Sequence, residues 1–496
     1  MERLSEYTLK SRVKEFIIFH VGSNHFFPQE ISLLSNRGYS DVRNTYLRLV
    51  LPPLLIESLK GIKGFDKAAF EAVHNAGQLV TSIRLNPAKK VDRATENPVP
   101  WCDDGYYLTE RPSFTLDPLF HAGCYYVQEA SSMFLWEVLK QSIGNKTTGL
   151  KVLDLCAAPG GKSTLLASYF TDGMVVSNEV IKARASILVE NITKWGSANV
   201  VVTNNDPSHF SVLTNFFDVI VIDAPCSGSG LFRKDNDAID EWSENNVKLC
   251  SQRQERIVND ILPCLKQGGL LIYSTCSYSK LEDEDVLDKL MTTNELESLQ
   301  LNVPDKWGVV CTQSDNHAAF GYRFYPYLTK GEGFFIAAFT KKKGGMDGYY
   351  SAQKLATLNK TELETIATFI PLSDKYTFFK QSDAIKTIEV GWLPSLQVLA
   401  KHLYIKKAGI EIGTIKGKDI IPHHELAMSH LPINGFGSLE LDKKQALQYL
   451  RRQDLFVESA LGWNLVKHCE LPLGWAKVLP NRMNNYYPQA WRILKD

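Results

Sequence analysis

Two cysteines end two apolar segments of the chain. Cys226 follows Val-Ile-Asp-Ala-Pro, and Cys276 follows Leu-Leu-Ile-Tyr-Ser-Thr. A single cysteine is more often a small buried apolar residue than a reactive one. Two thiols, each behind a polar turn at the end of an apolar run, instead favour nucleophilic chemistry by sulfur.

A glycine-rich turn lies upstream, where Asp154 and Ala-Pro-Gly-Gly-Lys-Ser join an apolar run to a helical segment. Gly160 and Gly161 let the backbone approach a ligand, and a helix N-terminus adds donors and a positive dipole end. The spacing before Gly-Lys-Ser differs from that of a P-loop, and G-x-G-x-x-G is absent. A lone Gly-Gly pair would favour an ordinary turn. With the two thiols downstream, it predicts a nucleotide-like cofactor.

Acidic residues follow the next three apolar runs. Glu179 stands 25 positions after Asp154, where a carboxylate can accept hydrogen bonds from ribose hydroxyls. Asp206 could face an adenine amine, or be a turn aspartate with a local bond. Asp223 begins Asp-Ala-Pro-Cys, whereas amino-group methyltransferases commonly carry Asn/Asp-Pro-Pro-aromatic there. The cysteine in that slot favours attack on carbon, and the whole pattern points to a methyltransferase that attacks a pyrimidine through sulfur.

An alternation of strands and helices must position these residues. Five mostly apolar runs predict buried strands at 151–155, 174–178, 199–203, 218–222 and 270–274. Ile181, Ala185, Leu188, Ile192 and Trp195 form one apolar face of a helix between the second and third. The alternation predicts an α/β fold with a doubly wound parallel sheet, whose neighbouring fourth and fifth strands bring both thiols to one crevice. Residues 322–327 and 333–339 predict a closing antiparallel pair.

The middle of the chain, 128–341, resembles the RNA 5-methylcytosine methyltransferases, which include the eukaryotic NSUN enzymes. The matching motifs are Tyr126-Val-Gln-Glu-Ala-Ser-Ser, Cys-Ala-Ala-Pro-Gly-Gly-Lys, Asp-Ala-Pro-Cys-Ser-Gly-Ser-Gly, Arg233-Lys-Asp, Gln252-Arg and Ser274-Thr-Cys. Thr81-Ser-Ile-Arg-Leu-Asn-Pro, Pro100-Trp-Cys, Gly474-Trp-Ala-Lys and Asn485-Tyr-Tyr-Pro look like the bacterial RsmF type, which methylates a cytosine in small-subunit ribosomal RNA. The resemblance covers about 51–496. It implies a Rossmann-like class I core, an N-terminal α+β RNA-binding segment and a C-terminal PUA-like domain.

The resemblance also implies a role for each site residue. Cys276 is the nucleophile that adds to cytosine carbon 6, so that carbon 5 can take a methyl group. Asp223 holds the base near ring nitrogen 3, Lys162 orients the base or the developing charge, and Cys226 assists release of the enzyme. The implied contacts to S-adenosylmethionine are Cys156, Ala157, Ala158, Pro159, Gly160, Gly161, Lys162, Glu179, Asp206 and Asp223. No residue is identified as the base that removes the carbon-5 proton.

Basic residues are candidate contacts to RNA phosphates. Arg84, Arg233 and Lys234 are one set; in the tail, Lys443, Lys444, Arg451 and Arg452 either contact phosphate or form a solvated helix face. The partner is ribosomal RNA or the small subunit, with transfer RNA or a non-catalytic assembly role as alternatives. A DNA cytosine methyltransferase is disfavoured because those enzymes use the cysteine after proline, which leaves Cys276 without a role. His423-His424 lacks further ligands at metal spacing, so no metal is expected.

Composition sets the outer bounds. A chain of 496 residues with 55 basic and 55 acidic residues predicts two to four domains of a globular protein with no net charge. Nine cysteines without a C-x-x-C pair, and no long apolar segment, predict reduced thiols in the cytoplasm, and no membrane partner. Residues 1–48 are either an accessory extension or the product of a mis-assigned start. We then expect an RNA-binding segment at 49–127, the methyltransferase domain at 128–341, a linker and first C-terminal segment at 342–400, and the PUA-like domain at 401–496.

Overall fold

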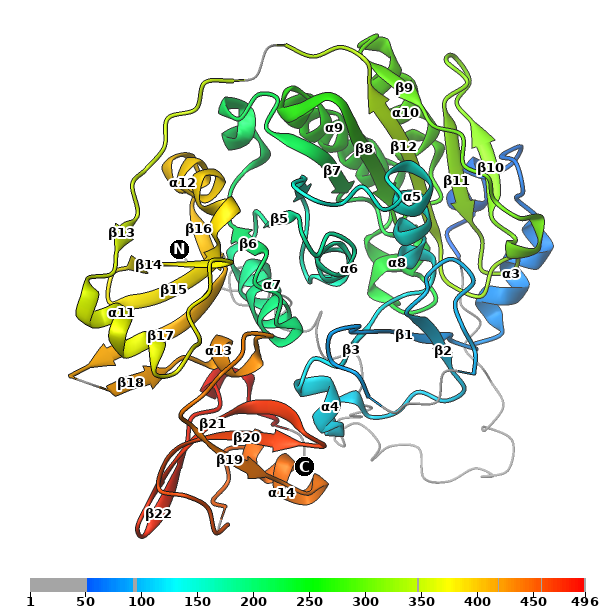
Figure 1. Cartoon of the computed structure of the whole chain (residues 1–496). Coiled ribbons are helices and arrows are strands. Elements are labelled where there is room, and N and C mark those ends of the chain that lie inside the picture. The colour runs from blue at the N-terminus through cyan, green and yellow to red at the C-terminus, as the bar shows by residue number, and fades with distance from the viewer. Residues whose placement is uncertain (1–50, 92–95, 346–347, 418, 456, 495–496) are drawn as a thin grey trace, which may run out of the picture. The chain divides into compact units, whose positions relative to one another are not determined.

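The computed structural model describes most of the chain, at 51–91, 96–345, 348–417, 419–455 and 457–494 (Figure 1). The extension expected at 1–48 lies outside these residues. Within the described ranges, none of the helices has the length and apolar content needed to cross a bilayer.

A central sheet carries the middle of the chain. Among the described residues its strands run in the order β10-β11-β12-β8-β7-β4-β5-β6-β16, and β9 pairs with β12. Their bounds are β4 (Lys151–Asp154), β5 (Met174–Asn178), β6 (Val200–Thr203), β7 (Phe217–Asp223), β8 (Leu265–Thr275), β9 (Leu296–Ser298), β10 (Val310–Gln313), β11 (Phe320–Phe324), β12 (Phe334–Lys341) and β16 (Ile405–Ala408). β4 to β8 pair in parallel, which confirms the doubly wound sheet. The predicted closing pair is β11 and β12, which are antiparallel.

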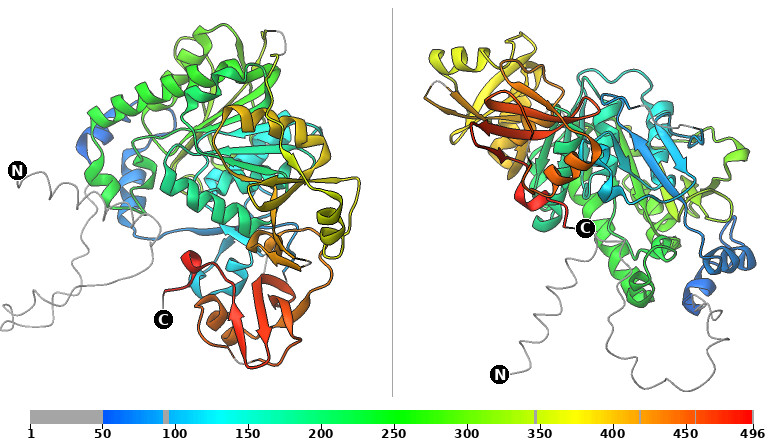
Figure 2. Two further views of the ribbon diagram at one scale, coloured as in Figure 1. Left: turned by 90° about the vertical axis from the view of Figure 1, so that its left-hand side faces the viewer. Right: turned by 90° about the horizontal axis from the view of Figure 1, so that it is seen from below.

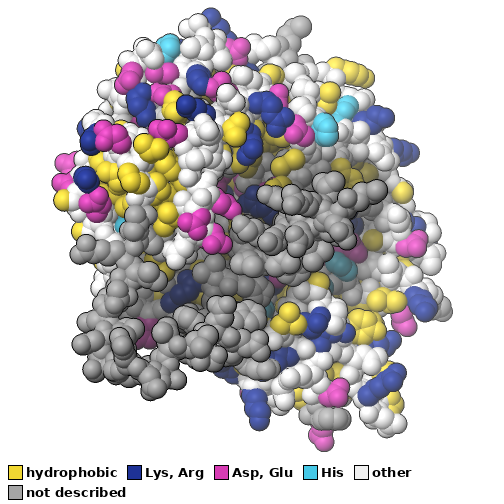
Figure 3. Space-filling model, turned by 180° about the vertical axis from the view of Figure 1, so that it is seen from behind, with side chains coloured by type: hydrophobic (Ala, Val, Ile, Leu, Met, Phe, Trp, Pro, Cys, Tyr) yellow, Lys and Arg dark blue, Asp and Glu magenta, His cyan; other side chains and the backbone are white. Residues whose placement is uncertain are grey.

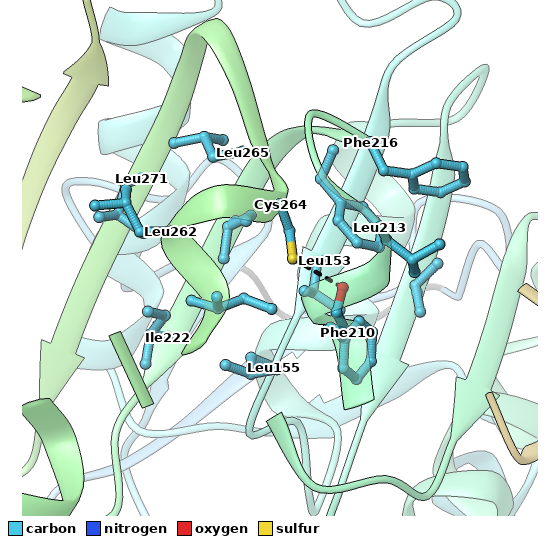
Figure 4. Close-up of a cluster of buried hydrophobic side chains, with 14 of the residues drawn as sticks. Leu153, Leu155, Phe210, Leu213, Phe216, Ile222, Leu262, Cys264, Leu265 and Leu271 are labelled. Carbon is cyan, nitrogen blue, oxygen red and sulfur yellow. Dashed lines mark hydrogen bonds between the residues drawn. The ribbon is translucent and has the colours of Figure 1, made fainter. Parts of the chain in front are cut away.

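Alternating side chains of these strands pack into two hydrophobic cores, one on each face of the sheet. Leu153 and Ile222 belong to a cluster that includes residues of α9 and α10, and part of this cluster is drawn in Figure 4. Val152 and Val221 belong to a second cluster with residues of α5, α6 and α7. The helices are α5 (Leu135–Ser142), α6 (Gly161–Tyr169), α7 (Lys182–Trp195), α8 (Asp237–Glu241), α9 (Glu244–Ile261) and α10 (Glu284–Thr292). Burial on both faces explains why the strand sequences are almost continuously apolar.

The apolar face predicted between the second and third strands is that of α7. Ala185, Leu188, Ile192 and Trp195 are buried as expected, but Ile181 is 47% exposed. Ile181 is the N-cap, with an extended backbone, so it stands outside the helical periodicity that the prediction assumed.

The N-terminal segment holds a small sheet of its own in the order β2-β1-β3. Its elements are α2 (Pro53–Ser58), α3 (Lys67–Asn75), β1 (Thr81–Leu85), β2 (Gly105–Leu108), α4 (Pro118–His121) and β3 (Tyr125–Val127), followed by a 3-10 turn at Ser131–Phe134. Trp101 lies in a turn before β2, and its indole N–H donates to the carbonyl of Ala130.

Two further sheets follow the central one (Figure 2). The first has the order β13-β14-β15-β17-β18, with β13 (Ala356–Thr357), β14 (Tyr376–Gln381), β15 (Ala384–Glu389), β17 (Ile410–Lys416), β18 (Asp419–Pro422) and helices α11 (Lys360–Ala367), α12 (Leu393–His402) and α13 (His424–Met428). The second has the order β19-β20-β21-β22, with β19 (Gly437–Glu440), α14 (Lys443–Leu450), β20 (Gly462–His468), β21 (Leu471–Leu479) and β22 (Arg482–Asn485).

The domain boundary expected at residue 400 is wrong. It falls inside α12, and the five-stranded sheet takes strands from both sides of it. β16, which lies between β15 and β17 in sequence, does not join the five-stranded sheet; it pairs antiparallel with β6 of the central sheet. Lys341, the residue before the expected linker, is buried at the end of β12 and donates to the carbonyls of Leu262 and Leu265.

Candidate active site

The two thiols meet at the carboxyl edge of the central sheet. Cys226 follows β7 and Cys276 follows β8, and these parallel strands are direct neighbours. Their Sγ atoms lie 3.0 Å apart, and both cysteines are free thiols of intermediate exposure. The hydrogen bond with Cys276, together with burial, raises the pKa of Cys226 well above its ordinary value. Cys226 is therefore held as a neutral thiol beside its partner at neutral pH.

A charged pair stands at the same edge. Lys162, in the first turn of α6, places its Nζ 2.7 Å from Oδ2 of Asp223, the last residue of β7. Ser274 donates to the other carboxylate oxygen of Asp223 at 2.8 Å. The ammonium also lies 5.0 Å from the centroid of the Phe334 ring. The sequence-predicted group of Lys162, Asp223, Cys226 and Cys276 is thus brought to one edge, with both a cation and a carboxylate available to a planar base.

The glycine turn is held in place from α7. Gly160 is the N-cap of α6 with a φ of 117°, a left-handed conformation that favours glycine. Arg184 donates to the carbonyl of Ala158 at 2.8 Å, and Asn191 donates to that of Pro159 at 2.9 Å. These bonds fix the carbonyls of the turn, while the amides at the start of α6 stay outside the helical ladder.

Asp154 lies fully buried at the end of β4. It accepts a bond of 2.6 Å from the Ser163 hydroxyl, and burial raises its pKa to about 7. Its other carboxylate oxygen, Oδ1, is buried and has no hydrogen-bond partner. An acceptor of this kind can receive a donor from a ligand bound over the turn.

The acidic residues after β5 and β6 differ in their surroundings. Glu179 is almost fully buried; it accepts from the amide of Ile181 at 2.9 Å and lies 3.6 Å from Arg184. Asp206 accepts from the amide and the hydroxyl of Ser208 at 3.1 and 2.7 Å, which is the local turn bond that the sequence left open. Ribose contact by Glu179 and adenine contact by Asp206 stay predictions.

Arg84 is wrong as a candidate phosphate contact, because its side chain is fully buried. Its guanidinium donates to Gln128 at 2.9 Å, to Thr164 at 2.5 Å and to the carbonyl of Gly161 at 3.3 Å. It also lies 4.6 Å from the Trp195 ring, and burial lowers its pKa to about 10. Arg84 therefore holds the start of α6. The sequence shows only a basic residue in a strand, and this does not predict such a role.

Arg233 is likewise engaged within the protein, and its side chain is only 6% exposed. It donates to Glu332 and to the carbonyls of Gly331 and Gln78. Lys234 is more exposed and lies 3.8 Å from Glu332. Because Glu332 is about a hundred residues away in sequence, the pairing could not be predicted. Phosphate contact stays a prediction for Lys234 and would require Arg233 to leave its partners.

The basic residues of the tail are divided. Lys443 and Lys444 begin α14 and are exposed, whereas Arg452 donates to the carbonyl of Tyr487. The face shown in Figure 3 mixes Lys and Arg with Asp and Glu side chains. For the tail cluster, phosphate contact and a solvated helix face both stay open as interpretations.

The histidine pair is part of the fold. His423 caps α13, and His424 is buried against Tyr487 and Trp491. In the part of the chain that the structure describes, no group of three or more His, Cys, Asp or Glu side chains could hold a metal ion.

The chain resembles known methyltransferases along most of its length. Family models match at 51–130, the N-terminal domain of 16S rRNA methyltransferase RsmF, at 143–340, 16S rRNA methyltransferase RsmB/F, and at 436–493, the RsmF PUA domain. Ribosomal RNA small subunit methyltransferase F of Shewanella sediminis is 30% identical over 413 residues, which cover 80% of this chain and 84% of that one. The chain belongs to the RsmB/F methyltransferase family.

Other relatives agree with this RsmB/F membership. The enzyme of the same name from Shewanella loihica is 29% identical over 410 residues, 79% of this chain and 83% of the relative. Among solved structures, PH0851 is 25% identical with a TM-score of 0.52, and the match covers 59% of this chain and 67% of that one. The expected Rossmann-like core, N-terminal domain and PUA domain are thus confirmed, but the matched PUA domain begins at 436 rather than at 401.

Proposed function

We propose that the protein transfers a methyl group from S-adenosylmethionine to carbon 5 of a cytosine in small-subunit ribosomal RNA through a covalent bond to Cys276. The observation that carries the proposal is the pair of thiols 3.0 Å apart at the carboxyl edge of β7 and β8. Membership of the RsmB/F family supports RNA methylation, and the names of the relatives support the ribosomal substrate.

The residues of the glycine turn fit S-adenosylmethionine. Its ribose hydroxyls are donors that suit the nearly buried carboxylate of Glu179, and its positive charge suits the buried, unpartnered oxygen of Asp154. Gly160 and Gly161 leave room for close approach to the start of α6. When bound, the cofactor supplies an electrophilic methyl group; the protein's own residues must activate the base.

Cys276 provides that activation. Its thiolate adds to carbon 6 of the ring, the carbon 5–carbon 6 double bond becomes a carbon 4–carbon 5 double bond, and the displaced electron pair moves onto ring nitrogen 3 and toward the carbonyl oxygen. Carbon 5 then becomes enamine-like and can take the methyl group. Lys162 and Asp223, hydrogen-bonded to each other at 2.7 Å, can hold the base edge where the negative charge develops.

Release of the enzyme reverses the addition. The proton on carbon 5 passes to a base, the carbon 5–carbon 6 double bond re-forms, and the carbon 6–sulfur bond breaks to give back the Cys276 thiolate. Cys226 suits this step, since it is held as a neutral thiol and its sulfur lies 3.0 Å from the departing one. An S–H group at this distance can donate to the thiolate as it leaves.

The test is transfer of labelled methyl groups from S-adenosylmethionine to unmodified small subunits, naked ribosomal RNA and transfer RNA. We expect 5-methylcytosine in ribosomal RNA with the wild-type protein and none with Cys276→Ala. Cys311→Ala is a matched control, because Cys311 is a partly exposed thiol on β10 that the proposal does not use.

Other outcomes would decide between the alternatives. Label in transfer RNA alone keeps the chemistry and rejects the ribosomal substrate. A folded protein that labels no RNA would favour a non-catalytic RNA-binding role.

A further inference from the structure

A buried carboxylate joins the loops that carry the two thiols. Glu282 ends a 3-10 turn at Lys280–Glu282 and has no exposed surface. It accepts from the amide and the hydroxyl of Ser227 at 2.7 and 2.6 Å, and from the hydroxyl of Ser277 at 2.6 Å. Ser227 directly follows Cys226, and Ser277 directly follows Cys276. One side chain thus holds the residue after each thiol.

Glu282 is itself fixed from two sides. Tyr273 of β8 donates its hydroxyl to the backbone carbonyl of Glu282 at 2.7 Å. Gln254 of α9 donates to the Glu282 carboxylate at 3.3 Å and to the carbonyl of Pro225 at 3.1 Å. Strand β8 thus holds the backbone of Glu282, and α9 adds one donor to its carboxylate beside those of the two loops.

The four groups that hydrogen-bond to the carboxylate of Glu282 all donate to it. Burial in this place disfavours a charge, and the four hydrogen bonds offset that cost. An amide at the same position would have to turn its NH₂ group toward at least one donor. The N–H groups of Ser227 and Gln254 require an acceptor at Oε1, and a carboxylate lets both serine hydroxyls donate to Oε2.

We infer that Glu282 is a positioning residue that sets the separation of the Cys226 and Cys276 sulfur atoms. Its effect on catalysis rests on the proposed function, since it acts only through the two thiols. Its effect on the distance between the thiols does not, and this difference allows separate tests.

The first test measures closure of a disulfide in the complete protein. Diamide takes two electrons and two protons from a pair of thiols, which then form an S–S bond. Peptide mapping follows the Cys226–Cys276 link over time. We expect rapid closure in the wild type and closure about tenfold slower in Glu282→Gln, because the NH₂ group of the amide must face either the N–H donors of Ser227 and Gln254 or the two serine hydroxyls, and so disturbs at least one of these bonds. Glu244→Gln is the control, since it removes the same charge from an exposed position on α9.

A second variant keeps the inference falsifiable if Glu282→Gln does not fold. Ser277→Ala removes one hydroxyl donor and leaves the carboxylate satisfied by Ser227 and Gln254, and it should slow closure severalfold. If Glu282→Gln folds and closes the disulfide at the wild-type rate, the inference is wrong. If Glu282→Gln does not fold, a wild-type closure rate in Ser277→Ala would overturn it.

The second test measures methyl transfer. Glu282→Gln should lower kcat about tenfold or more while KM for RNA stays within twofold, because the RNA surface is untouched. A rise in KM with unchanged kcat would contradict a positioning role. If closure slows in Glu282→Gln but the wild type labels no RNA, the proposed function fails and the positioning of the thiols stands.

Discussion

Gly230 is the position where one added methyl group should disturb the site most. It lies in a 3-10 turn at Ser229–Leu231, and its amide donates to the carbonyl of Cys276 at 2.8 Å. A Cβ atom built there would lie 2.5 Å from the carbonyl oxygen of Gly333 and 2.7 Å from that of Cys276. Both are backbone atoms, which cannot rotate away as a side chain can. Gly230→Ala must therefore push the Cys276 loop or the Gly333 loop outward.

The magnitude follows from the size of this clash. Overpacking by one methyl group in a tight site costs about 1–3 kcal/mol, and each kcal/mol lowers the Tm of a large domain by roughly 2–4 °C. A shift of the Cys276 loop approaching 1 Å would lower kcat by about 10²-fold. We therefore expect a fall of a few degrees in Tm and a much larger relative loss of methyl transfer.

Calorimetry and initial rates of methyl transfer check the expectation. The control is Gly391→Ala, because a Cβ atom at Gly391 meets nothing within 4 Å and this glycine lies outside the site. A Gly230→Ala protein with wild-type Tm and wild-type kcat would refute the packing argument and the importance of the Cys276 loop geometry.

Three further predictions concern stability and ligand binding. Lys89 donates to the carbonyls of Ala122 and Lys194, and burial lowers its pKa to about 7. In the unfolded chain a lysine has a pKa of about 10.4, so between about pH 7 and 10 only the unfolded state holds this proton. The Tm of the wild type should therefore rise relative to that of Lys89→Met across this range, and a constant difference in Tm would contradict the prediction. Arg84→Met should lower the free energy of unfolding by about 2–4 kcal/mol, and the salt dependence of RNA binding should not change. A slope of log K against log salt concentration that is smaller by about one would instead support a phosphate contact by Arg84. Arg184→Ala, which frees the carbonyl of Ala158, should weaken S-adenosylmethionine binding about tenfold by titration calorimetry, and unchanged affinity would argue against the turn's role.

The parts of the fold that the sequence predicts well are those with a regular pattern. The five parallel strands are buried on both faces, so their apolar runs stand out, and the thiol positions follow from strand order alone. Cys226 and Cys276 are brought together for this reason. The boundary at residue 400 fails because β16 leaves one sheet to join another, and no local signal marks such an exchange of partners.

Individual polar residues are harder to predict because their partners lie far away in sequence. Arg84 looks like a surface cation, yet the start of α6 closes over it. Glu282 stands in Leu-Glu-Asp-Glu, which reads as a solvated acidic run, although the loops after Cys226 and Cys276 surround it. Charge and spacing locate the site, but only tertiary contacts distinguish a residue that faces RNA from one that holds the scaffold.

The division of labour between the two thiols is tested most directly by trapping the covalent intermediate. Cys226→Ala is incubated with S-adenosylmethionine and unmodified small-subunit RNA, and the protein is digested and analysed by mass spectrometry. We predict an adduct of methylated cytidine on the peptide that carries Cys276, and no such adduct in the double variant Cys226→Ala, Cys276→Ala. Efficient methylation by the single variant Cys276→Ala, or an RNA adduct on Cys226 in Cys276→Ala, would contradict the assignment of Cys276 as the nucleophile.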